Sequence, residues 1–135
     1  MGSSSAVKDD KWCFACGSDN PHGLHLTGFH DEGEYHVVQF TPERQHQGWQ
    51  DRAHGGIVAT LLDEVMTRLL YARGDDAVTA ELTVRYHQPL PTGAPVEARA
   101  RETERRGRLV RVEAEVRTGE GTLIASGQGK FMLIR

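Results

Sequence analysis

The chain has 135 residues, of which 38% are hydrophobic and 26% charged, and its net charge is −3. This length predicts one domain that can bury a core without metal or disulfide support, and the charge argues against nucleic acid or an anionic membrane as partner. No run of 18 apolar residues predicts a membrane span, and no apolar signal-peptide stretch follows Met1, so the cytoplasm is the expected location.

The first third of the chain reads as mostly irregular. Residues 1–11 are polar and are predicted to be a disordered tail or an expression remnant, with a single domain over 12–135. Residues 12–33 mix Gly, Pro, Asn, Asp and His, which predicts tight turns. Alternation over 34–40 predicts a strand, and Pro42 and Gly48 predict a loop over 41–53.

One long helix is predicted over residues 54–72. Apolar side chains recur there at three- and four-residue steps, as expected for a wide buried stripe. These residues are Ile57, Val58, Leu61, Leu62, Val65, Met66, Leu69 and Leu70. Gly74-Asp75-Asp76 is expected to end the helix.

Only strands are predicted after the helix. In 79–87, one face is expected to hold Ala80, Leu82, Val84 and Tyr86, and the other Thr79, Glu81, Thr83 and Arg85. Further strands are expected around 96–100, 110–116 and 123–134, with hairpin turns at 105–108 and 119–121. One helix followed by antiparallel strands predicts an α+β fold in which a curved sheet wraps the helix.

Gly55 and Gly56 lie where this helix begins. The first amides of a helix lack partners within the helix and carry a partial positive charge. Two glycines let a ligand oxygen approach that backbone, which suits an anion or the oxyanion of an acyl-transfer intermediate. Alternatively, the glycines only make the bend from loop to helix.

Asp63 is predicted to border the apolar stripe, whereas Glu64 is predicted to point further from it. A carboxylate at such a border is partly desolvated, which suits a general base or a nucleophile, although both residues could be ordinary solvated charges. Thr79 could position a water molecule or hold the carboxylate, or it could simply favour a strand.

The spacing of Gly55 and Asp63 restricts any shared chemistry. Eight residues correspond to roughly 12 Å along a helix. A reacting carbonyl needs contacts of about 3–3.5 Å, so one bond cannot touch both groups of one helix. If both act on one substrate, they must come from two chains, and the site must lie at a dimer interface.

Two other clusters leave alternatives open. Arg105, Arg106 and Arg108 surround Gly107 at a predicted hairpin tip, where they could bind phosphates or remain solvated. Cys13 and Cys16 could form half of a zinc site with His22, His25 and His30. Their irregular spacing favours a tight turn with partly buried thiols, so no metal and no cofactor is predicted.

The string from His54 to Glu64 resembles the helix motif of hot dog-fold acyl-CoA thioesterases of the PaaI (phenylacetate-pathway) type. The strand 79–86 before Pro89-Leu90, the turn 102–108, and the opening Cys13-Phe14-Ala15-Cys16-Gly17 resemble this superfamily as well. The resemblance covers the chain from about Trp12 onward.

This resemblance implies a five- or six-stranded antiparallel sheet around one central helix, assembled into homodimers and often into homotetramers. It implies that the Gly55 amide polarises a thioester carbonyl and that Asp63 of the partner chain activates water or attacks directly. Thr79 would support the carboxylate, His54 would shape the loop, and Gln47 would stand where many members have Asn. The residues expected to bind acyl-CoA are Gly56, Glu64, Arg106, Gly107 and Arg108.

Three other functions are weighed against hydrolysis. A non-catalytic acyl-CoA-binding domain on the same fold is favoured by the missing Asn. A hydratase would need an Asp/His pair, and the helix has no His after His54. A zinc-organised interaction module would depend on Cys13 and Cys16. The sequence does not identify the acyl group.

Overall fold

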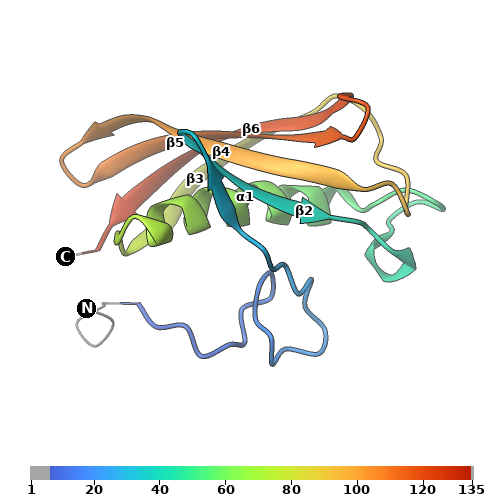
Figure 1. The fold of residues 1–135 in the computed structure, drawn as a ribbon, viewed down its shortest axis with the longest axis horizontal. Coiled ribbons are helices and arrows are strands. Elements are labelled where there is room, and N and C mark those ends of the chain that lie inside the picture. Colours follow the sequence, from blue (N-terminus) through green and yellow to red (C-terminus); the bar gives the residue numbers. More distant parts are fainter. Residues whose placement is uncertain (1–6, 135) are drawn as a thin grey trace.

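The computed structural model describes residues 7–134, and Figure 1 shows a curved sheet covering one long helix. The elements are β1 (His30–Glu32), β2 (Tyr35–Phe40), a short 3-10 turn (Arg44–His46), α1 (Gly55–Ala72), β3 (Ala77–Tyr86), β4 (Val96–Arg106), β5 (Leu109–Thr118) and β6 (Leu123–Leu133). The six strands pair antiparallel in the order β1-β2-β4-β5-β6-β3. This arrangement confirms the predicted α+β hot dog architecture.

The apolar stripe of α1 packs against the inner face of the sheet. Seven of its side chains are buried, namely Val58, Leu61, Leu62, Val65, Met66, Leu69 and Leu70. Gly129 of β6 faces this stripe, and a Cβ atom there would lie 2.6 Å from the Phe131 ring and 3.3 Å from the Met66 methyl group. Glycine at this position therefore lets the helix and the sheet pack closely. Within the described residues, no helix combines the length and apolarity needed to cross a membrane.

The N-terminal segment, residues 12–26, runs along the side of α1 that faces away from the sheet, as the blue trace in Figure 1 shows. The Leu24 and Leu26 amides donate to the carbonyls of Phe14 and Ala15 at 2.8 and 2.9 Å. Ala15, Leu24 and Leu26 are buried in the same core as the α1 stripe. Residues 1–6 of the predicted tail lie outside the described residues, and residues 7–11 contain no helix or strand.

Strand β3 forms one edge of the sheet and contains a bulge. Its pairing with β6 shifts register between Thr79 and Glu81, which leaves Ala80 without a partner. Because a bulge adds one residue to one strand, the alternation of side chains is reversed on its far side. Thr79 pairs with the buried Phe131 and lies on the helix face, so its predicted grouping with Glu81, Thr83 and Arg85 is wrong.

Candidate active site

The start of α1 presents one backbone amide without a partner. His54 is the N-cap, and its Nδ1 accepts from the Gly56 amide at 2.8 Å, which requires a neutral imidazole to carry its proton on Nε2. The amides of Ile57 and Val58 both donate to the His54 carbonyl. Among residues 7–134, the Gly55 N–H has no hydrogen-bond acceptor. Gly55 is exposed, and its N–H lies at the positive end of the helix, so it can donate a hydrogen bond to an oxyanion.

The loop before α1 is held by its own hydrogen bonds. The His54 amide donates to the His46 carbonyl at 2.8 Å, and the Ala53 amide donates to the Leu90 carbonyl at 2.8 Å. Gln47, which the sequence offers in place of the family's Asn, accepts from the Asp51 amide through Oε1 at 3.2 Å. In this arrangement the Gln47 side-chain oxygen stabilises the loop.

Tyr86 also contacts this helix start, although nothing in the sequence marks it as a residue of the site. Its hydroxyl donates to the Gly55 carbonyl at 2.7 Å, from the end of β3. The ring lies 3.4 Å from the position a Cβ on Gly55 would take. Tyr86 thus fixes the peptide next to the free amide. The sequence does predict that Tyr86 points toward the helix, but an aromatic side chain in that position usually belongs to the hydrophobic core.

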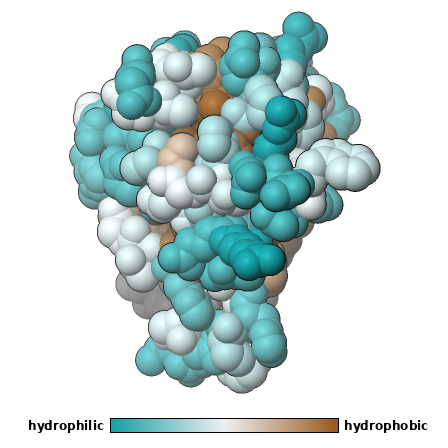
Figure 2. Space-filling view, turned by 90° about the vertical axis from the view of Figure 1, so that its right-hand side faces the viewer, coloured by the Kyte–Doolittle hydropathy of each residue, from teal (hydrophilic) through white to brown (hydrophobic). Residues whose placement is uncertain are grey.

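Two hollows flank Gly55. One, of about 440 Å³, is lined by Gly48, Trp49, Ala53, His54 and Gly55. The other, of about 280 Å³, is lined by Ala53, Gly55, Val58, Tyr86, His87, Gln88, Pro89, Leu90 and Ile124. Figure 2 views the molecule from this end and shows a mostly hydrophilic face interrupted by a small hydrophobic patch. Gly55 thus borders two hollows from which a ligand could approach its amide.

Asp63 lies two turns further along α1, facing β3. The Thr79 hydroxyl donates to its Oδ1 at 2.8 Å, across the bulge described above. Asp63 is half-buried, and this burial raises the pKa of its carboxyl, while the hydrogen bond from Thr79 opposes that rise. A carboxylate with a raised pKa is a stronger base than an ordinary aspartate, and the hydroxyl holds its orientation.

Glu64 is buried, so it is not the ordinary solvated charge that the sequence left open as one interpretation. Its side chain is only 8% exposed, and it faces the N-terminal segment, where the Cys16 thiol is its hydrogen-bond partner. Burial raises the pKa of Glu64, and burial together with this carboxylate raises the pKa of Cys16. The pattern of α1 alone does not reveal this burial, because the segment that covers Glu64 is distant in sequence and irregular.

The basic hairpin tip lies at the opposite end of the helix from Gly55. Arg105 pairs with Asp75, just after α1, at 2.7 Å, and with Glu102 at 2.9 Å. Arg106, Gly107 and Arg108 are exposed. Within one protomer the tip is therefore more than a helix length from the Gly55 amide, roughly 27 Å for 18 residues.

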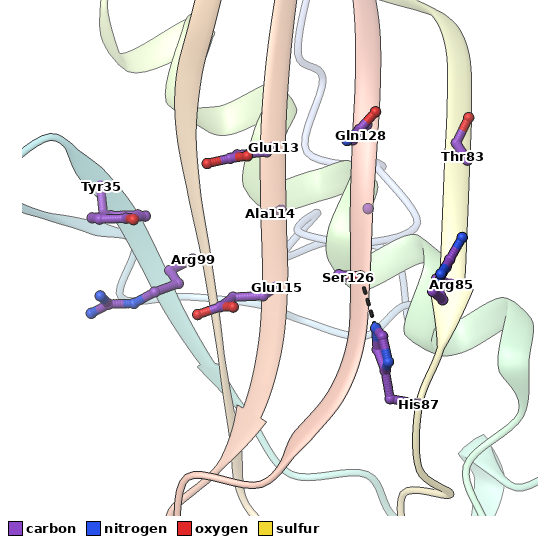
Figure 3. A pocket seen from close by; sticks show the side chains of 11 residues that line it. Tyr35, Thr83, Arg85, His87, Arg99, Glu113, Ala114, Glu115, Ser126 and Gln128 are labelled. Carbon is purple, nitrogen blue, oxygen red and sulfur yellow. Dashed lines mark hydrogen bonds between the residues drawn. The ribbon is translucent and has the colours of Figure 1, made fainter.

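A larger pocket of about 550 Å³ lies on the outer face of the sheet. Figure 3 shows its side chains in front of the strands, with α1 behind them. The pocket is polar, and the His87 Nε2 and Ser126 Oγ atoms lie 2.9 Å apart in it. Its other labelled members are Tyr35, Thr83, Arg85, Arg99, Glu113, Ala114, Glu115 and Gln128. His87, just after β3, also lines the smaller hollow beside Gly55, whereas Asp63 lines neither.

Comparisons with known proteins match most of the chain and its fold. The family model described as "Thioesterase superfamily" matches residues 50–125, which include α1 and the strands β3 to β5. The mouse acyl-coenzyme A thioesterase THEM5 is 30% identical over 66 residues, 49% of this chain. That match spans only 27% of the length of THEM5.

Two solved structures are also similar along most of the chain. The thioesterase superfamily protein RHA08564 aligns with a TM-score of 0.81 and 25% identity, over 96% of this chain and 72% of its own. The TT0310 protein of Thermus thermophilus aligns with a TM-score of 0.74 and 32% identity, over 82% of this chain and 93% of its own. These matches confirm the family that the motif from His54 to Glu64 indicated.

Proposed function

This chain belongs to the thioesterase superfamily, and we propose that it hydrolyses acyl-CoA thioesters to free CoA and a carboxylic acid. The observation that carries the proposal is the free Gly55 amide at the start of α1, together with the half-buried Asp63 on the same helix. An acyl-transfer site needs a donor for the oxyanion and a base for the attacking water, and these two groups supply both.

The two groups act on one thioester only if they come from two protomers. Their spacing on α1 is eight residues, roughly 12 Å, which exceeds the reach of one reacting carbonyl. The free edge of β3 supports a homodimer, because its ten residues can pair with a second copy, and it exposes Val78 and Tyr86. Assembly of such dimers into tetramers and a cytoplasmic location stay predictions.

The reaction then follows from the properties of each group. The thioester carbonyl oxygen accepts from the Gly55 N–H, while Asp63 of the partner subunit takes a proton from water. The hydroxide adds to the carbonyl carbon, the C–S bond breaks, and the protonated Asp63 returns the proton to the departing thiolate. Thr79 orients the carboxylate through its hydrogen bond. Direct attack by Asp63 would instead pass through an anhydride.

The substrate's CoA part would extend toward the partner subunit's hairpin tip. Twelve residues separate Asp63 from Asp75, the residue that anchors the tip through Arg105. In a dimer that brings Gly55 against the partner's Asp63, the nine helical steps from Asp63 to Ala72 place the end of the partner's α1, next to its tip, about 14 Å from the reacting carbon. Arg106 and Arg108 would bind phosphates there, with Gly107 keeping the turn open. The acyl group would enter one of the two hollows beside Gly55.

A non-catalytic acyl-CoA-binding domain is the second candidate. It is favoured by Gln47, whose side-chain oxygen already accepts from the Asp51 amide. A thioesterase turns over acyl-CoA, whereas a binding domain only binds it. We expect purified protein to release free thiol catalytically from at least one member of a panel of short, long and aromatic acyl-CoAs. Saturable binding of these esters without thiol release would instead assign the binding function.

Heterodimers test whether the site is shared between chains. Gly55→Pro removes the donor at a helix position that favours proline, and Asp63→Asn removes the base. The two variants are co-expressed with different affinity tags and purified as heterodimers, each of which contains one intact shared site. We expect about half of the wild-type activity, while both homodimers stay nearly inactive. Heterodimers as inactive as the homodimers would contradict a shared site.

A further inference from the structure

Three metal-ligating side chains from two separate segments meet beside α1. The Sγ atoms of Cys13 and Cys16 and a carboxylate oxygen of Glu64 all lie within 4.8 Å of one another. Glu64 is one of three buried polar or charged side chains in the described residues, and it is only 8% exposed. A carboxylate in such a position needs a compensating charge or several hydrogen bonds, and the Cys16 thiol is a weak donor.

The turn that carries the two thiols is rigidly built. The Gly17 amide donates to the Cys13 carbonyl at 2.8 Å, and the Ala15 amide donates to Cys13 Sγ at 3.3 Å. A Cβ atom on Gly17 would lie 2.4 Å from the Cys13 nitrogen, so glycine is required for the chain to close around the thiols. Backbone amides that donate to a sulfur stabilise a thiolate, and such contacts orient the ligands of metal sites.

We propose that Cys13, Cys16 and Glu64 bind one Zn²⁺ ion, which fastens the N-terminal segment to α1. Two thiolates and a carboxylate are ligands that zinc accepts, and soft sulfur donors select it over Mg²⁺ or Ca²⁺. Zinc–sulfur bonds of about 2.3 Å in a tetrahedron place two sulfurs roughly 3.8 Å apart, so side-chain movements of about 1 Å complete the site. None of the three histidines considered from the sequence belongs to the cluster, and His25 instead contacts the Asn20 carbonyl while His30 contacts Glu32.

The fourth zinc ligand would be water. A hollow of about 330 Å³ opens beside the three ligands, between the N-terminal segment and α1. Arg68 also borders it, and its charge lowers the pKa of Glu64, but the ion pairs within 4 Å among the described residues do not include these two, and the guanidinium lies over the rings of Phe29 and Tyr71, at 5.2 and 5.0 Å. The hollow gives solvent and metal a path to the thiols, so three protein ligands and one water make a four-coordinate site.

A disulfide between Cys13 and Cys16 explains the cluster less well. Both cysteines are free thiols in the structure. A disulfide would remove the thiol that donates to Glu64 and leave a buried carboxylate with no donor from this turn. Zinc accounts for all three side chains, whereas a disulfide accounts for two.

Metal titration of the full, reduced chain tests the site directly. We expect one equivalent of Co²⁺ to give a thiolate-to-cobalt charge-transfer band, and one equivalent of Zn²⁺ to displace it. Zinc should also protect both thiols from a thiol reagent and raise the melting temperature. A cobalt spectrum without the thiolate band, or equal thiol reactivity with and without zinc, would overturn the proposal.

Variants show which side chains hold the metal. Glu64→Gln keeps the size of the side chain, and we expect it to weaken zinc binding by at least about 10-fold, with a larger loss for Cys16→Ser. Glu120→Gln, in the exposed β5–β6 turn, is the matched control and should bind like the wild type. Circular dichroism checks that each variant is folded. Wild-type affinity in folded Glu64→Gln would refute a role for Glu64, and the wild-type titration stands even if a variant misfolds.

Discussion

Asp63 and Glu64 are neighbours on α1, yet they lie in different chemical surroundings. Asp63 faces the edge strand β3, where a hydroxyl from Thr79 holds a half-buried carboxylate. Glu64 faces the N-terminal segment, where it is buried against two thiols. One residue turns a helix by about 100°, and here that rotation separates a proposed base from a proposed metal ligand. An acidic pair in a motif therefore does not imply a shared function.

The largest effect is expected when Asp63 alone is replaced, which tests whether Asp63 and Glu64 have separate roles. We expect Asp63→Asn to lower kcat/KM for acyl-CoA by at least about 100-fold, because a positioned base contributes on that scale. The same variant should still bind one equivalent of zinc, since its side chain faces β3. Thiol release and cobalt spectra measure the two properties, with Glu120→Gln as the control. Unchanged turnover would contradict the role of Asp63 as the base, and loss of the cobalt band would contradict the separate roles of Asp63 and Glu64.

The helix start provides the next largest effect. Gly55→Pro removes the free N–H, and His54 has the extended conformation that precedes proline well, with ψ of 138°. Gly55→Ala adds a Cβ but keeps the amide, so it is the matched control. We expect the proline variant to lose about 100-fold in kcat and the alanine variant to lose much less. Equal losses would point to a steric effect of the Cβ near Tyr86 instead of a lost donor.

Thr79 gives a smaller effect with a defined pH dependence. Its hydrogen bond lowers the pKa of Asp63 and so opposes the rise caused by burial. Thr79→Val removes that bond, so the pKa should rise further and the acid limb of the kcat/KM profile should move to higher pH. We expect a loss of about 10-fold near neutrality. Thr79→Ser should restore the wild-type profile, and a profile that does not move in Thr79→Val would contradict the contact.

The long helix and the strand pattern were predictable from the sequence because their apolar residues repeat regularly. The predicted range 54–72 agrees with α1, Gly55–Ala72, to within one residue. Eight apolar side chains at three- and four-residue steps leave little freedom in that assignment. The turns at Gly107 and after Thr118 were equally visible, since glycines interrupt the alternation there.

The errors arose where tertiary contacts override a regular pattern. The alternation around Thr79 is uninterrupted in the sequence, so nothing marked the bulge at Ala80 that turns Thr79 toward Asp63. A solvated Glu64 stayed an open alternative in the sequence, because the irregular segment 12–26 has no periodicity that would mark it as a second cover for α1. Local sequence encodes the faces of an element, but not which distant segment will cover each face.

Tyr86 gives the smallest effect and tests how far the helix start depends on β3. Its hydroxyl donates to the Gly55 carbonyl at 2.7 Å from a side chain that is 54% exposed. A single such bond contributes about 1 kcal/mol, so Tyr86→Phe should lower kcat by roughly fivefold at most. Because Tyr86 positions the Gly55 peptide and does not touch Asp63, the acid limb of the pH profile should stay where it is, unlike in Thr79→Val. A shifted limb in Tyr86→Phe would mean that the helix start and Asp63 are coupled within one protomer, which the separation of the two groups along α1 argues against.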